Sequence, residues 1–222
     1  MDEAKPAWRR RTKAEHRWPV VLALIVLGTL QWYLPDRLTP GPRWLFPLIE
    51  AVIGVVLIAA NPVRMRRDTP RLRMLSLGLI TVASLGTVWT VVMLIRDIVS
   101  GHDTGSAGQL LATGGGIYVM NVLTFAVWFW ELDRGGSVAR SLGSDPYPDF
   151  LFAPMTSPDM AHQDWEPWFA DYLYLSFTNS TAFSPTDTLP MTRGAKFGMA
   201  AESAIALVTA ALVVAKAVNA LG

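Results

Sequence analysis

Five long runs of apolar residues, separated by polar segments, dominate the pattern along the 222-residue chain. The runs cover residues 19–34, 44–60, 74–95, 110–130 and 197–221. A helix needs about 20 apolar residues to cross a bilayer, and about 17 is the lower limit. The last three runs exceed this length, whereas the first two are short. Aromatic residues suited to the headgroup layer flank the short runs, namely Trp18, Trp32, Tyr33 and Trp44. The pattern predicts an all-α integral membrane protein with five transmembrane helices.

The segment before the last run starts as a helix and then becomes polar. Residues 165–178 can form a helix about half a membrane thickness long. Residues 179–192 are rich in Ser and Thr, and Pro185 and Pro190 break a helix. Non-helical backbone at membrane depth persists only where protein buries it or water lines it. We therefore expect one re-entrant, pore-like half-helix before the last span.

Basic residues are concentrated on one side of the predicted spans. Six precede the first run and five lie in the linker after the second, whereas the linkers after the first and third runs hold three in total. By the positive-inside rule, the N-terminus is cytoplasmic in a multi-pass protein of the plasma (inner) membrane. Arg64, Arg66 and Arg67 of the second linker are candidates for contact with lipid headgroups. Their alternative role is only to determine the topology.

The remaining composition indicates no enzymatic chemistry. The chain has no Cys, its three His are scattered, and no catalytic or metal-binding motif occurs, so we predict neither an enzyme nor a metal site. A net charge of +1 with localised basic residues does not indicate a nucleic-acid partner. Glu50 and Glu202 lie within apolar runs, where ionisable groups are costly and usually functional. Glu50 is predicted either to bond a neighbouring helix or to form an ion site.

Other polar positions have structural interpretations. The Gly114, Gly115, Gly116 triplet predicts close helix packing or a hinge, and Asn121 is expected to bond across helices. Residues 131–164, rich in Pro, Gly and Asp, are predicted to form a loop against the membrane face. Asp133 and its neighbours would be a solvated helix end.

Residues 174–202 read YLSFTNSTAFSPTDTLPMTRGAKFGMAAE. This stretch resembles, without a gap, the pore module of the potassium-channel superfamily, whose pattern is roughly YFSFVTLTTVGYGDITPVTPLARSLAMLE. The residues that match are Tyr174, Ser176, Phe177, Thr181, Asp187, Pro190, Thr192, Ala195 and Glu202. The chain also resembles an uncharacterised bacterial family of multi-span membrane proteins with a pore-like C-terminus.

The resemblance implies three regions. They are a basic cytoplasmic N-terminus at 1–18, a three-helix membrane bundle at 19–107 and a channel-like pore module at 108–222. The module would contain the outer helix, the loop 131–164, a pore helix at 165–178, a filter-like loop at 179–192 and an inner helix at 196–221. Four copies would surround a central axis, with Tyr174 and Glu202 supporting the pore.

The filter positions depart from the family. Where the family has TVGYG, this chain has Ala182, Phe183, Ser184, Pro185 and Thr186. Without glycine, the ring of stacked carbonyls that selects K⁺ is not expected. The predicted lining is instead a ring of hydroxyls with a carboxylate at its mouth, formed by Thr181, Ser184, Thr186 and Asp187. We expect a homotetrameric, ion-channel-like protein that passes a cation or a small solute, with no cofactor apart from a monovalent cation in transit.

Alternatives remain open for function and topology. In one alternative, the pore fold no longer conducts and serves as an interaction or structural module. In another, the protein is a transporter in which Glu50 and Glu202 couple transport to protons. The charge pattern places the pore loop on the cytoplasmic side, whereas potassium-channel filters face outside. An inverted pore, a sixth span formed by 165–183, or an N-terminus on the outside would each resolve this difference.

Overall fold

The fold class is all-α. The computed structural model describes residues 6–65, 69–101, 106–182 and 187–219. Helices make up 74% of the structure, and the described residues contain one sheet of two short strands. The elements, with η for 3₁₀ helices, are η1 (Ala7–Arg9), α1 (Trp18–Tyr33), η2 (Asp36–Leu38), α2 (Leu45–Ala60), α3 (Pro70–Val99), α4 (Ala107–Leu132), η3 (Asp133–Gly135), α5 (Ser137–Leu142), β1 (Phe150–Phe152), α6 (Ala153–Thr156), η4 (Pro158–Met160), α7 (Phe169–Ala182), β2 (Thr188–Pro190) and α8 (Arg193–Asn219).

Three helices, α3, α4 and α8, are long and apolar enough to cross a membrane, which indicates a membrane-embedded protein. Helices α1 and α2 coincide with the two short apolar runs and have 16 residues each, about 24 Å of helix. The residue that caps the C-terminus of each helix precedes a proline: Leu34 precedes Pro35, and Asn61 precedes Pro62. The residue before a proline is driven out of helical geometry, so the short lengths follow from the sequence.

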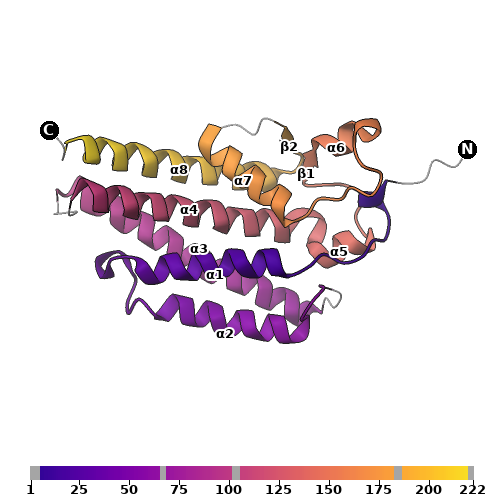
Figure 1. Cartoon of the computed structure of the whole chain (residues 1–222), viewed down its shortest axis with the longest axis horizontal. Helices are drawn as coiled ribbons and strands as arrows, with labels where there is room; N and C mark the ends of the chain where they lie inside the picture. The colour runs from indigo at the N-terminus through magenta and orange to yellow at the C-terminus, as the bar shows by residue number, and fades with distance from the viewer. Residues whose placement is uncertain (1–5, 66–68, 102–105, 183–186, 220–222) are drawn as a thin grey trace, which may run out of the picture.

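Helix α4 lies at the centre of the bundle. It packs against α1 and α3 on one side and against α7 and α8 on the other. Consecutive helices from α1 to α4 run antiparallel, and α7 and α8 lie across α4 from α1 and α2 (Figure 1). A capping box begins α4, in which Ser106 and Gln109 exchange side-chain and backbone hydrogen bonds of 3.3 and 3.2 Å.

The segment before α1, the linker after α2 and the segment between α4 and α7 meet at one end of the bundle, which we call the basic end. His16 forms a β-bridge with Arg64, and Thr12 N donates to Ser141 O at 2.9 Å. These contacts join parts of the chain that the charge pattern places on the same side of the membrane.

Helix α7 is shifted along the chain relative to the predicted pore helix at 165–178. It begins at Phe169, after Pro167, and continues to Ala182. Thr178 and Thr181 donate their hydroxyls to the carbonyls of Tyr174 and Phe177 at 2.9 Å, so these polar residues stay helical. The first four residues of the predicted filter-like loop therefore belong to the helix.

The predicted loop at 131–164 contains short elements and buried charges. It includes η3, α5, β1, α6 and η4. Asp133 is 0% exposed and Arg134 is 3% exposed, so the prediction of a solvated helix end is wrong. The charges stay buried because each one has a partner from elsewhere in the chain.

Candidate functional site

The carboxylate of Glu202 is the point at which α7 is attached to α8. Glu202 is 0% exposed and accepts hydrogen bonds from three α7 side chains. Ser176 Oγ donates to Oε1, Ser180 Oγ donates to the same oxygen at 3.0 Å, and Asn179 Nδ2 donates to Oε2 at 2.7 Å. The three donors lie on one face of α7 because they are spaced three and four residues apart. A carboxylate inside an apolar helix thus has its acceptor capacity used within the chain.

Helix α4 completes this site. The Ser176 hydroxyl also lies 2.7 Å from the carbonyl of Val122, and Asn121 Nδ2 donates to Glu202 O at 3.3 Å. Asn121 thus bonds across helices, as expected. Asn179 Nδ2 lies 2.9 Å from Met199 O. We call this buried group on α4, α7 and α8 the Glu202 cluster, comprising Asn121, Ser176, Asn179, Ser180 and Glu202.

The other predicted residues of α7 lie outside this cluster. Tyr174 is 52% exposed. Thr181 is exposed, and its hydroxyl bonds back to its own helix. The structure thus leaves both side chains on the surface of the single chain.

The predicted lining residues lie partly beyond the part of the chain that is described. Ala182 is the last residue of α7. Phe183, Ser184, Pro185 and Thr186 lie outside the described residues. Asp187, which follows them, is exposed.

The start of α7 and the strand that follows α7 in sequence, β2, both contact residues of the basic end. The start of α7 is held by Tyr172, whose hydroxyl donates to Asp133 Oδ2 at 2.5 Å. Strand β2, after α7, pairs antiparallel with β1, before it. Thr192 Oγ1 donates to Asp149 Oδ1 at 2.7 Å, and Asp149 N donates to Asp133 Oδ1 at 2.8 Å. Figure 1 shows β1 and β2 side by side, close to α7.

A buried ionic network lies beneath the N-terminal segment at the basic end. Arg134 donates to Trp8 O, and Arg140 donates to Trp130 O and to Asp133 O. The Arg140 guanidinium also lies 5.0 Å from the ring centre of Tyr172. Sequence reasoning missed this network because its partners are as much as 126 residues apart.

Glu15 joins the network from the N-terminal segment. Its carboxylate accepts from Trp130 Nε1 at 2.7 Å and from Phe169 N at 2.6 Å, and lies 3.8 Å from Arg140 Nη2. Burial raises the pKa of this carboxyl above its ordinary value, and the opposing effects of Arg140 and of the hydrogen bonds are smaller. The N-terminal segment is therefore bound to α4, to α5 and to the start of α7.

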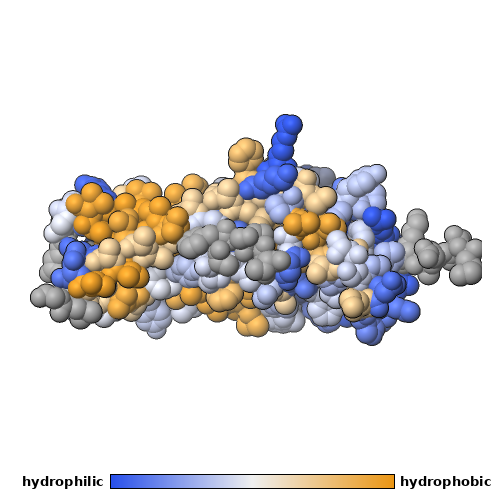
Figure 2. All heavy atoms as spheres, turned by 90° about the horizontal axis from the view of Figure 1, so that it is seen from above, coloured by the Kyte–Doolittle hydropathy of each residue, from blue (hydrophilic) through white to orange (hydrophobic). Residues whose placement is uncertain are grey.

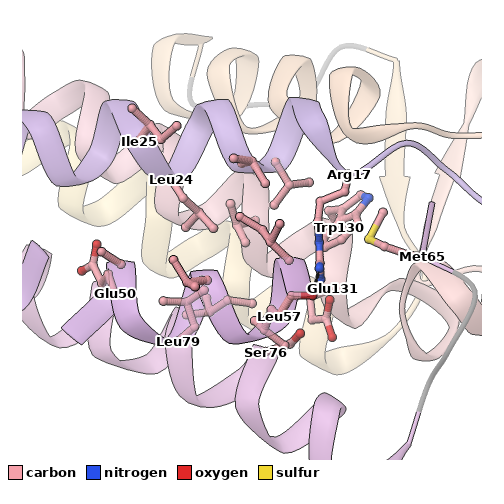
Figure 3. Close-up of a pocket in the computed structure, with 18 of the residues that line it drawn as sticks. Arg17, Leu24, Ile25, Glu50, Leu57, Met65, Ser76, Leu79, Trp130 and Glu131 are labelled. Carbon is pink, nitrogen blue, oxygen red and sulfur yellow. Dashed lines mark hydrogen bonds between the residues drawn. The ribbon is translucent and has the colours of Figure 1, made fainter. Parts of the chain in front are cut away.

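A separate cavity of about 540 Å³ lies between α1, α2, α3 and α4. Its walls are mostly apolar, and Arg17 and Glu50 lie at opposite ends of the residues that line it (Figure 3). Arg17 donates to the carbonyls of Leu57 and Asn61 at the end of α2. Glu50 bonds to Gln31 of α1, so it contacts a neighbouring helix and also borders a cavity.

Arg64, one of the three arginines predicted to contact lipid headgroups, contacts other residues of the chain. Its guanidinium donates to Ala14 O at 2.6 Å and lies 2.8 Å from His16 Nε2. Arg66 and Arg67 lie outside the described residues. Arg64 therefore attaches the linker to the N-terminal segment.

Comparison with protein-family models, with curated proteins and with solved structures finds no match to this chain.

Proposed function

We propose that the protein is a homotetrameric, ion-channel-like membrane protein in which α4, α7 and α8 form the pore module. In this proposal α7 is a re-entrant half-helix, and the segment that follows it lines a path for a cation or a small solute. The observation that supports this proposal most strongly is the Glu202 cluster, which joins α7 to α8 by buried hydrogen bonds. The resemblance of residues 174–202 to the potassium-channel pore module agrees with this arrangement.

The course of the chain around α7 supports the re-entrant assignment. The helix has 14 residues, about 21 Å, which is short of a bilayer core of about 30 Å. Because β2 pairs with β1, the chain comes back to the end from which α7 started. This course argues against the alternative in which residues 165–183 form a sixth span.

The exposure of α8 supports assembly into an oligomer. Only 28% of its most apolar window is buried inside the chain, compared with 56% for α4. Figure 2 shows a hydrophobic surface over the C-terminal part of α8 and a hydrophilic one toward the basic end. In a tetramer the inner helices of neighbouring copies would cover part of this surface, and lipid would cover the rest.

The distribution of charge supports an inverted pore. The N-terminal segment and the residues that flank α7 meet at the basic end. If the positive-inside rule holds, this end is cytoplasmic and the pore loop enters from the cytoplasm of a plasma-membrane protein. All five apolar helices would then be spans, with α1 and α2 short.

The test is ion flux through the full chain reconstituted in liposomes, together with its mass in detergent. We expect a tetrameric mass and a flux of K⁺ or Na⁺ that changes by at least several-fold in Ser184→Val and Thr186→Val. The matched control is Thr178→Val, which removes a hydroxyl that bonds back within α7. This variant should leave the flux unchanged.

A tetramer without flux would favour the non-conducting alternative, in which the pore fold serves as an interaction module. The absence of glycine at the filter positions supports that alternative. A monomer or dimer, or equal flux in all three variants, would contradict the channel proposal.

A further inference from the structure

The pair formed by Glu50 and Gln31 has two buried acceptor atoms without a donor. Both side chains are more than nine-tenths buried, with 6% and 5% exposure. Gln31 Nε2 donates to Glu50 Oε1 at 2.9 Å, which uses one acceptor. Glu50 Oε2 and Gln31 Oε1 have no hydrogen-bond partner among the described residues. Burial of a carboxylate without a cationic partner is costly, so this pair has the chemistry of an incomplete site for a positively charged donor.

Glu50 also lines the cavity between α1 and α4, and the cavity has the size of a ligand site. Its volume of about 540 Å³ falls within the range of about 300–1,000 Å³ that is usual for small-molecule sites. Leu24 and Leu79 are among the apolar residues between its two ends. A ligand that fits these walls has a bulky apolar body.

The arginines of the cavity are remote from Glu50. Arg17 contacts the carbonyl of Leu57, which follows Glu50 by seven residues on α2, about 10 Å along the helix. Arg73 and Glu131 line the same end as Arg17, where Glu131 offsets part of the positive charge. A cation bound beside Glu50 is therefore separated from these arginines by the apolar part of the cavity.

Gly28 leaves open space next to the carboxylate. A Cβ at this position would lie 3.9 Å from Glu50 Oε2 and 3.8 Å from the Cβ of Pro47. A larger side chain there would occupy the part of the cavity that adjoins Glu50 without removing its charge.

We propose that this cavity binds a hydrophobic organic ammonium ion. Glu50 lines the cavity, whereas Gln31 does not, so an N–H group of the ligand would donate to Glu50 Oε2. The apolar body of the ligand would lie between α1 and α2. Both helices are apolar, so the ligand reaches the site from the lipid phase. This site is formed by α1 to α4 and is independent of the Glu202 cluster.

The experiment measures saturable binding to the full chain in nanodiscs, with empty nanodiscs as the background. Three probes with one apolar body separate charge from shape: 1-adamantylammonium, 1-adamantanol and 1-adamantanecarboxylate. We expect the ammonium ion to bind at least tenfold more tightly than the alcohol, and the carboxylate to bind most weakly. Glu50→Gln should lower the affinity for the ammonium ion at least tenfold and leave that for the alcohol unchanged.

Gly28→Leu provides a second variant that keeps the carboxylate, and it should weaken the binding of both the ammonium ion and the alcohol. Gly115→Leu is its control, because nothing lies within 4 Å of a Cβ at Gly115 and that residue does not line the cavity. Circular dichroism and gel filtration establish that the variants fold. Three results would each overturn the proposal. The wild type could bind the ammonium ion and the alcohol with equal affinity, Glu50→Gln could bind the ammonium ion as tightly as the wild type, or the wild type could show no saturable binding. Tighter binding of the carboxylate would likewise overturn it and indicate an anionic ligand at the Arg17 end.

Discussion

Asn179 and Glu202 are joined by a hydrogen bond of 2.7 Å from the side-chain amide of α7 to the carboxylate of α8. The backbone carbonyl of Asn179 also accepts a hydrogen bond of 3.1 Å from Ser203 Oγ, so each of the two helices donates a hydrogen bond to the other. These bonds are buried, and each donor that loses its acceptor there is left without water to replace it. Glu202 is therefore the side chain on which the largest number of buried α7 donors converge.

Replacement of Glu202 by Leu should destabilise the fold more than any exposed substitution. It removes the acceptor of Ser180 and one of the two acceptors of Ser176 and of Asn179, which keep Val122 O and Met199 O. Each donor that is left unsatisfied costs about 1–3 kcal/mol. Glu202→Gln keeps one acceptor oxygen, so its loss of stability should lie between those of the wild type and Glu202→Leu. Thermal unfolding in detergent measures the difference, with exposed Asp159→Asn as the control. Equal midpoints for Glu202→Leu and the control would contradict this role of the cluster.

The glycine triplet of α4 gives a test of helix packing. A Cβ at Gly114 would lie 2.6 Å from Val213 Cγ1 of α8, whereas nothing lies within 4 Å of one at Gly115. Because the χ1 angle of valine is stiff in a helix, Gly114→Ala should cost about 1–3 kcal/mol by overpacking. Gly115→Ala should be neutral or slightly stabilising.

Combining Gly114→Ala with Val213→Ala should recover part of the loss in unfolding free energy, because the second substitution removes the atoms that clash. Denaturant unfolding of the wild type and of the three variants, Gly114→Ala, Gly115→Ala and the double variant, in one detergent gives the comparison. A loss of the same size in Gly115→Ala would indicate a backbone effect instead of contact with α8.

Two neighbouring tyrosines of α7 should respond differently to loss of their hydroxyl. Tyr172 is 0% exposed and donates to Asp133, whereas Tyr174 is 52% exposed. Tyr172→Phe should cost about 1.5–3 kcal/mol, the range for hydrogen bonds to charged groups. Tyr174→Phe should change the unfolding free energy by less than about 0.5 kcal/mol. A comparable loss in both variants would show that the bond to Asp133 is not what stabilises the start of α7.

Glu15 gives a prediction about pH. Burial raises its pKa in the folded state above the unfolded value near 4.5, so the folded state holds the proton more tightly. The stability from this group is fully present below the unfolded pKa and is lost as the pH rises through the folded pKa. Relative to Glu15→Gln, the wild type should therefore lose thermal stability between pH 4 and pH 8.

The measurement is the difference in unfolding midpoint between wild type and Glu15→Gln across that range, with Asp159→Asn as the reference. A difference that stays constant, or that moves in favour of the wild type as the pH rises, would contradict a raised pKa for Glu15.

The helices of the bundle could be predicted from sequence because their signals are local. Apolar runs, together with the prolines at positions 35 and 62, place α1 and α2 to within one residue. The match of residues 174–202 to the pore module singled out Glu202, and the structure places that side chain against α7. The glycine triplet predicted close helix packing at Gly114, although the sequence does not identify Val213 as the residue packed against it.

The buried network at the basic end could not be predicted in the same way. Arg134 and Arg140 look like solvated charges because their neighbours in sequence are polar. Their partners Trp8 and Glu15 come from the other end of the chain, and no periodicity reports such a contact. The start of α7 was missed by four residues for a local reason: Pro167 disfavours helical geometry at the residue before it, and the helix begins only at Phe169.

The contact between α7 and Glu202 has a consequence for biosynthesis. During translation α7 leaves the ribosome about 20 residues before Glu202 does, and in that interval Ser176 can bond to Val122 O of α4, whereas Ser180 lacks its acceptor on α8. The contact between α7 and the carboxylate of α8 therefore forms only after residue 202 has been synthesised, although α7 itself comes earlier in the sequence.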